Sequence, residues 1–228
     1  MSNVYGHEWA ANYEKRANAA MPGREGLYRL CLAAFRGIAS PARILVVGCG
    51  TGEELLLLLK AYPEATFVGI EPAQPMLDLC AQHVAASTMS HRVRLLSVSL
   101  DAFADVEPFD AATSILVSQH VEPDAAAGRF FAKIAALLKP DGCLSSADTH
   151  VAAGQDRDAM VTLWCEQAAM SGMDADVLDG MRNMLRSHLL RDEATIVGLL
   201  RAAGFERILK PFSSLIYGAW IAHKPGAP

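Results

Sequence analysis

A long apolar run is missing from the 228-residue sequence. The longest apolar stretch expected on a helix is the leucine run Leu55 to Leu59, far short of the roughly 20 residues that cross a bilayer. The N-terminus begins Met1-Ser2-Asn3 and shows no basic segment followed by an apolar one, as a secretory signal would have. We therefore expect a soluble, cytoplasmic protein without a membrane partner.

Clustered cysteine is missing as well. The five cysteines form no C-x-x-C pair and no close group with histidine, so we expect no zinc or other metal site. An odd number of scattered thiols is typical of reduced, mostly buried side chains in the cytosol. The five residues are Cys31, Cys49, Cys80, Cys143 and Cys165.

Excess positive charge is the third absence. Lys and Arg number 20 against 25 Asp and Glu, which gives a net charge of -5, and no long basic run occurs. Tight binding to a phosphate backbone depends on such charge, so a nucleic-acid partner is not expected. Apolar residues make up 52% of the chain, which is typical of a folded domain with a sizeable core.

Short β-branched runs alternate with helical stretches from position 42 onward. This alternation predicts βαβ units, and hence an α/β protein with a doubly wound, mostly parallel sheet and helices on both faces. Strands are expected at 43–47, 66–70, 93–98, 110–117 and 143–147, and helices at 51–62, 74–87 and 124–138, with a turn at 140–142.

Two helical segments lie outside this alternation. Residues 1–40 are expected to form an N-terminal helical cap, and the Met-rich residues 155–190 a helical lid insertion. A helix at 191–203 and strands at 207–210 and 215–224 complete the chain. No internal repeat or linker is visible, so we expect a single domain over residues 1–228.

A glycine-rich turn, Gly48-Cys49-Gly50-Thr51-Gly52, joins the first expected strand to the first expected helix. Glycines at alternate positions let a ligand lie against bare backbone, and the N-terminus of the following helix attracts a carboxylate or a phosphate. A dinucleotide fingerprint would need glycine at position 53, where the chain has Glu53, and a P-loop would need Gly-Lys-Ser/Thr. The turn therefore favours a cofactor without a phosphate group.

Two acidic residues follow the next strands. Glu71 ends the second strand, 19 residues after Gly52, where a carboxylate can accept hydrogen bonds from both hydroxyls of a ribose. Asp101 follows the third strand, where its side chain can accept from an adenine amino group. The alternative for Asp101 is a helix N-cap or turn residue. Together with the glycine turn, these positions indicate an adenosine site.

The ordered set resembles the class I S-adenosylmethionine (SAM) dependent methyltransferases over roughly residues 42–224. The resemblance rests on Val47–Gly52, Glu71-Pro72, Met76-Leu77, Asp101, Phe109-Asp110 and Leu138–Gly142. It implies a Rossmann-like sheet of seven strands whose last strand is antiparallel. SAM is then the cofactor and S-adenosylhomocysteine (SAH) the product.

The resemblance also implies roles for individual residues. Gly48 to Gly50 would line the methionine moiety, Glu71 the ribose, and Met76 and Asp101 the adenine. Tyr5, Trp9 and Tyr13 recur every four residues, a helical stripe that either packs on the core or brings Tyr13 to the methionine end. The predicted cofactor contacts are Tyr13, Gly48, Cys49, Gly50, Gly52, Glu71, Pro72, Met76, Asp101, Ala102 and Ser118.

A closer similarity is to the carboxy-SAM synthases and the small-molecule methyltransferases near them. It rests on the segments 119–123 and 182–185. In the synthases, the resemblance implies that the arginine matching Arg182 binds the carboxylate carried on the sulfonium. The chain departs from that branch in its common glycine loop and in Arg24, which stands where an aromatic residue is expected. Methyl transfer to a small molecule is therefore the leading interpretation. A carboxy-SAM synthase and a non-catalytic SAM-binding module are the alternatives.

Methyl transfer is an in-line displacement, so the protein must align the acceptor and exclude water. A general base is needed only where the acceptor is protonated. His120 is the favoured candidate for this role, ahead of Asp148 and His150, because all three follow strand ends where ligands of open α/β sheets bind.

The predicted substrate contacts are His120, His150 and Arg182. Arg182 and Arg186 lie four residues apart, either on a solvated helix face or as an electropositive lid over an anionic group. A homodimer is left open.

Overall fold

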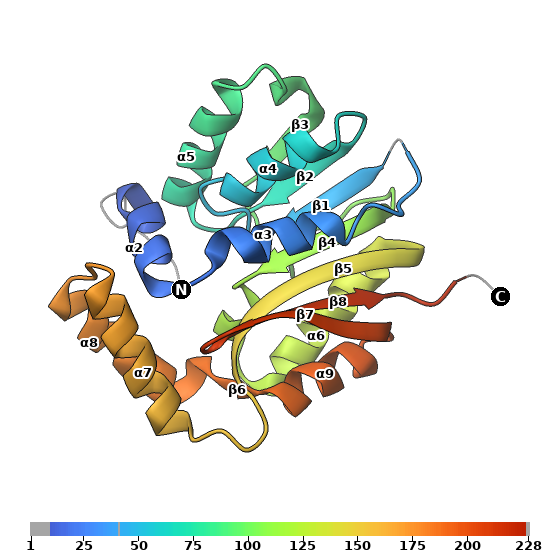
Figure 1. Cartoon of the computed structure of the whole chain (residues 1–228). Coiled ribbons are helices and arrows are strands. Elements are labelled where there is room, and N and C mark those ends of the chain that lie inside the picture. The colour runs from blue at the N-terminus through green and yellow to red at the C-terminus, as the bar shows by residue number, and fades with distance from the viewer. Residues whose placement is uncertain (1–9, 41, 227–228) are drawn as a thin grey trace.

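The computed structural model describes residues 10–40 and 42–226, and all of their side chains except those of His188 and Leu189. A central β-sheet carries helices on both faces (Figure 1). The strands are β1 (Arg43–Val47), β2 (Thr66–Ile70), β3 (Val93–Leu96), β4 (Phe109–Ile115), β5 (Leu138–Val151), β6 (Arg191–Asp192), β7 (Glu206–Ser214) and β8 (Tyr217–His223).

Helices and short turns connect the strands and cover the sheet. The helices are α2 (Tyr13–Ala20), α3 (Arg24–Ala33), α4 (Glu53–Ala61), α5 (Gln74–Ala85), α6 (Asp124–Leu137), α7 (Arg157–Met170), α8 (Ala175–Met184) and α9 (Glu193–Ala202). The turns are η1 (Ser90–Arg92), η2 (Ser118–His120) and the π-helical η3 (Leu185–Leu189). No described helix is long and apolar enough to cross a membrane.

The sheet has the strand order β3-β2-β1-β4-β5-β8-β7. The strands β1 to β5 pair in parallel, and β8 lies antiparallel to both β5 and β7. The Rossmann-like, mostly parallel sheet with an antiparallel last strand is thus confirmed. Because the order reverses between β1 and β4, the carboxyl ends of these strands form the crevice where ligands of such sheets bind.

The central strands are buried on both faces, as the continuous apolar runs predict. Ile44 to Val46 of β1 are fully buried, and Val47 is 2% exposed. One core lies between the sheet and α6 and α9, and another between the sheet and α4 and α5. A third core joins the N-terminal helices to the lid helices α7 and α8, at one end of the sheet (left in Figure 1).

The fifth strand is longer than the sequence predicts. The expected turn at 140–142 lies inside β5, as an irregularity at which the pairing with β4 shifts register. Asp141 has a φ of 61°, and a Cβ on Gly142 would lie 2.8 Å from the carbonyl oxygen of Lys139. The strand continues to Val151 because β8 pairs with it from Cys143 to Thr149 and β6 pairs with its last two residues.

The strand count and several element boundaries also differ from the prediction. Arg191–Asp192 forms β6, an additional short strand, where the sequence predicts the start of a helix. Within residues 10–40 and 42–226 the sheet thus has eight strands rather than seven. The helix α9 begins at Glu193, and β7 extends from Glu206 to Ser214 rather than over 207–210. The pairing of β6 with β5 and of β7 with β8 decides these boundaries. Such pairing is a long-range contact that the local sequence does not encode. Tyr5 and Trp9 lie outside the described residues.

Candidate functional site

The glycine turn is held against the end of β2. The backbone N–H groups of Gly48 and Cys49 both donate to the carbonyl oxygen of Ile70, at 2.8 and 3.1 Å. Gly48, Gly50 and Gly52 have φ values of 68°, 54° and 92°, in the left-handed region that favours glycine. A Cβ on Gly52 would lie 2.7 Å from the Cys80 sulfur. The turn therefore needs glycine for its backbone as well as for ligand access.

Gly48 provides a test of this close packing. A Cβ at position 48 would lie 2.5 Å from Cγ2 of Val117, and its φ of 68° would strain alanine. We expect Gly48→Ala to lower the free energy of unfolding by about 3 kcal/mol, from backbone strain and overpacking together, in a chemical denaturation experiment. Gly154→Ala is the matched control, because its φ is 79° but nothing lies within 4 Å. Equal losses in the two variants would contradict this account.

Glu71 is tied to the glycine turn. Its Oε2 accepts a hydrogen bond from the N–H of Gly50 at 3.2 Å, and its Oε1 accepts one from the N–H of Ala73 at 2.9 Å. Burial raises the pKa of this half-buried carboxyl, and the two backbone hydrogen bonds oppose the rise. The buried Met76 lies close by, because a Cβ on Gly50 would lie 3.6 Å from its Cε. The structure thus brings Glu71, Met76 and the turn together.

The N-terminal helices cover this turn. The Thr51 hydroxyl donates to the Glu14 carboxylate of α2 at 3.3 Å, and Arg24 at the start of α3 forms an ion pair with Glu53. Arg24 is only 6% exposed and also donates to Asn18 at 2.8 Å. A buried guanidinium therefore lies beside the first turn of α4.

Tyr13 of α2 lies in the same region. Burial raises the pKa of its phenol, and the charges of Arg24 and Glu71 both act on it. The sequence predicts a cofactor contact for Tyr13 but none for Arg24. The sequence contains one indication for Arg24: an arginine stands at this position, where the carboxy-SAM synthase branch has an aromatic residue.

Three other predicted cofactor contacts lie on the surface. Asp101 and Ala102 are exposed in the turn after β3, where the N–H of Phe103 donates to the carbonyl oxygen of Ser99 at 3.0 Å. Pro72 is exposed directly after β2. A contact of these residues with the cofactor, and of Asp101 with adenine, stays a prediction.

The turn η2 after β4 carries two predicted site residues. Ser118 is 1% exposed, and its hydroxyl donates to Oδ1 of Asp148 at 2.7 Å. His120 is exposed, with its Nε2 3.4 Å from the side-chain nitrogen of Gln119. Val117, just before the turn, packs against Gly48, so the start of η2 lies beside the glycine turn.

Asp148 and His150 are both buried, at 1% exposure. Burial raises the pKa of Asp148 to about 7, although Ser118 and Arg191 favour its ionised form. Lys210 donates to Nε2 of His150 at 2.6 Å. The centroids of the His150 and Trp220 rings lie 5.2 Å apart, with the two rings nearly perpendicular. Burial and Lys210 together lower the pKa of His150. The structure therefore places His150 in the packing between β5, β8 and α9, and its contact with a substrate stays a prediction.

The arginines of the lid have local partners. Arg182 forms an ion pair with Asp179 at 3.0 Å, and its Nε lies 3.3 Å from the Cys165 sulfur. Arg186 forms an ion pair with Asp158 at 3.4 Å, between two largely exposed side chains. These contacts favour the interpretation of a solvated helix face over an electropositive lid.

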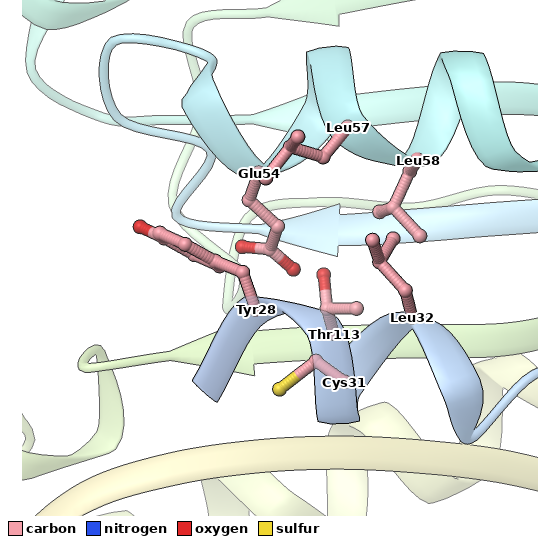
Figure 2. A pocket seen from close by; sticks show the side chains of 7 residues that line it. All are labelled: Tyr28, Cys31, Leu32, Glu54, Leu57, Leu58 and Thr113. Carbon is pink, nitrogen blue, oxygen red and sulfur yellow. The ribbon is translucent and has the colours of Figure 1, made fainter. Parts of the chain in front are cut away.

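A buried carboxylate lies behind the glycine turn. Figure 2 shows Glu54 of α4 facing the Thr113 hydroxyl of β4, with Tyr28 and Cys31 of α3 beside them, in a small cavity. Glu54 is 7% exposed, and its Oε1 has no hydrogen-bond partner within the described part of the chain. Burial raises the pKa of Glu54 to about 7, which the Thr113 hydroxyl opposes and the charge of Glu53 reinforces. Separately, residues 10–40 and 42–226 contain no group of three acidic, histidine or cysteine side chains that could hold a metal ion.

Residues 44–142 match the family model described as a methyltransferase domain. This match covers less than half of the chain. Over 69 residues the chain is 35% identical to the tRNA (guanine-N(7)-)-methyltransferase of Chlorobium phaeobacteroides, a match that covers 30% of this chain. The chain spans about a third of the length of that curated relative, 34%.

Solved structures share the fold of this chain at low identity. An O-methyltransferase family protein from Burkholderia thailandensis superposes with a TM-score of 0.70 at 14% identity, covering 99% of this chain and 62% of that one. The N-methyltransferase NodS from Bradyrhizobium japonicum, in complex with SAH, gives 0.60 at 15% identity, covering 89% and 87%. These similarities show the fold.

Proposed function

We propose that this protein is a SAM-dependent methyltransferase that transfers a methyl group to a small-molecule acceptor. The observation that carries the proposal is the hydrogen bond from the N–H of Gly50 to Glu71, which joins the glycine turn to the carboxylate that follows β2. The family match at residues 44–142 and the fold support it.

The residues of this site fit an adenosyl amino acid. The half-buried Glu71 presents a carboxylate for the two ribose hydroxyls, and Gly48 to Gly50 present backbone without side chains for the methionine part. The buried Arg24 at the N-terminal helices supplies a positive charge beside the turn, suited to the methionine carboxylate. Glu53, its partner in the ion pair, is a poor neighbour for a pyrophosphate, which disfavours a nicotinamide cofactor.

When bound, SAM supplies a methyl group on a positively charged sulfur. The chain then has to hold the acceptor in line with that bond and keep water away, which is catalysis by proximity. His120 is our candidate for taking a proton from an acceptor, because it is exposed in the turn η2, whose preceding residue Val117 packs against Gly48. Asp148 is assigned no such role, because its carboxylate is buried behind Ser118.

The alternatives receive less support. A carboxy-SAM synthase is disfavoured by the common glycine loop and by Arg24, which stands where that branch has an aromatic residue. A nucleic-acid acceptor, as the name of the Chlorobium relative describes for that protein, would favour a basic surface, and this chain has a net charge of -5. A small-molecule acceptor is consistent with both observations.

Calorimetry tests the cofactor first. We expect the purified protein to bind SAM and SAH and to melt at a higher temperature in their presence, since a ligand of the folded state stabilises it by mass action. NAD is the matched control and should produce no shift. Labelled SAM with a metabolite panel, with bulk tRNA as one member, then identifies the acceptor. Absence of binding to both SAM and SAH would refute the proposal.

A further inference from the structure

The turn η2 (Ser118–His120) is held by a buried carboxylate from another strand. Asp148 of β5 accepts hydrogen bonds from the Ser118 hydroxyl, at 2.7 Å, and from the backbone N–H of Gln119. Both Ser118 and Asp148 are 1% exposed, so water does not compete for these bonds. The carboxylate is thus bonded to the turn through one side chain and one backbone group.

The same turn is held from β6 by a buried guanidinium. Arg191 donates to the carbonyl oxygen of Ser118 at 2.9 Å and to that of Val121, and its Nε donates to Asp124 at 2.8 Å. Arg191 is 7% exposed. The sequence predicts the start of a helix at Arg191, whereas the structure buries this side chain beneath the turn. A carboxylate thus satisfies the donors of this turn, and a guanidinium its acceptors.

A third contact fixes the middle of the turn. The side-chain oxygen of Gln119 accepts a hydrogen bond from the backbone N–H of Thr149 at 3.0 Å. Gln119 is 7% exposed, and it lies between the buried Ser118 and the exposed His120. The turn therefore has its buried side fastened to β5 and its outer side open to the mouth of the site.

This turn borders the methionine end of the cofactor site. Val117 precedes it and packs so closely on Gly48 that a Cβ there would lie 2.5 Å from a Val117 methyl group. Glu71, which marks the ribose end, reaches the glycine turn at Gly50 instead. A displacement of η2 would therefore disturb the wall beside Gly48 and leave the ribose end in place.

We propose that Asp148 is a positioning residue that fixes the turn η2, through Ser118 and Gln119, as the wall against which the methionine end of SAM binds. The inference rests on the proposed function. It explains why a carboxylate stands in this buried position: it accepts from Ser118, from Gln119 and, at 3.5 Å, from Ser146. Asparagine has one acceptor oxygen and would turn an NH2 donor toward other donors.

The test compares SAH with adenosine, which lacks the amino-acid part. We expect Ser118→Ala and Asp148→Asn to weaken SAH binding about 10-fold by calorimetry, the worth of one buried hydrogen bond, and adenosine binding by about 2-fold at most. Ser146→Ala is the matched control, because its hydroxyl also faces Asp148 but lies on β5, not on the turn. It should bind both ligands like the wild type. The double variant S118A/D148N should bind SAH no more weakly than D148N.

Several results would overturn the inference. Equal losses for SAH and adenosine would indicate a general structural effect, and a loss in S146A as large as in S118A would remove the turn from the explanation. Wild-type affinity for SAH in S118A would do the same, even where Asp148→Asn fails to fold. A wild-type protein that binds adenosine but not SAH, or neither, would refute the proposed function instead, before any variant is compared.

Discussion

Replacing Glu71 with alanine should weaken SAH binding by about 100-fold or more. The reason is that a carboxylate bonded to both ribose hydroxyls makes two charge-assisted hydrogen bonds, each worth about 1.5–3 kcal/mol, and every 1.4 kcal/mol is about tenfold in affinity. The same change also removes the acceptors of the N–H groups of Gly50 and Ala73, which loosens the glycine turn. Isothermal titration calorimetry with SAH measures the loss directly.

Two further variants separate the charge of Glu71 from its other roles. Glu71→Gln keeps the size and one acceptor oxygen, so we expect an intermediate loss of about 10-fold. Asp78→Ala removes an exposed carboxylate of α5 whose partner is Gln74 at 2.6 Å, and it should bind SAH like the wild type. Wild-type affinity in Glu71→Ala would show that this carboxylate does not hold the sugar, and the assignment of the site would fall with it.

The sequence predicts the part of the site that is local along the chain. Three alternating glycines force a left-handed turn, and Glu71 ends the next buried strand, so the parallel pairing of β1 and β2 brings both to one edge. No long-range detail is needed for that prediction. The distance between Gly50 and Glu71 follows from the register in which Val47 pairs with Ile70.

Long-range packing accounts for what the sequence leaves undecided. His150 lies beyond the expected end of the fifth strand at 147, and only the pairing of β5 with β8 extends the strand and places His150 against Trp220. Arg191 lies in a helical pattern in sequence, yet a two-residue pairing with β5 turns it beneath η2. Arg24 lies nearly thirty residues from Glu53, and the docking of α3 on the sheet decides their ion pair. Such contacts depend on tertiary packing that overrides local patterns.

Glu54 gives the protein a stability that falls as the pH rises. An unfolded glutamate titrates near the value of 4.5, whereas burial holds the pKa of Glu54 in the folded protein at about 7. Between these pH values the folded state keeps a proton that the unfolded state has released. The contribution of this group is therefore fully present below about pH 4.5 and is lost as the pH rises through about 7. Above pH 7, α4 holds an ionised carboxylate beneath α3, facing the Thr113 hydroxyl (Figure 2).

Removing this charge should stabilise the protein in alkaline solution. We expect Glu54→Gln to raise the free energy of unfolding at pH 8.5 by about 2 kcal/mol, since one pKa unit corresponds to about 1.4 kcal/mol and the buried amide keeps part of the cost. At pH 5 the two proteins should differ little, because Glu54 is then protonated in the fold. Asp148 and His150 titrate in both proteins, so their contributions cancel in the difference.

Denaturant unfolding of the two proteins at a series of pH values measures this difference. Glu64→Gln, at an exposed position in the loop after α4, is the matched control and should follow the wild type throughout. The expected stability difference between Glu54→Gln and the wild type comes from the cost of burying an ionised carboxylate. The Oε1 of Glu54 has no hydrogen-bond partner among the described residues. A stability difference that stays constant from pH 5 to pH 8.5 would mean that Glu54 does not change its charge in the fold. A Glu54→Gln variant less stable than the wild type at pH 8.5 would mean that the anion has a partner that the geometry of α3 and β4 does not supply.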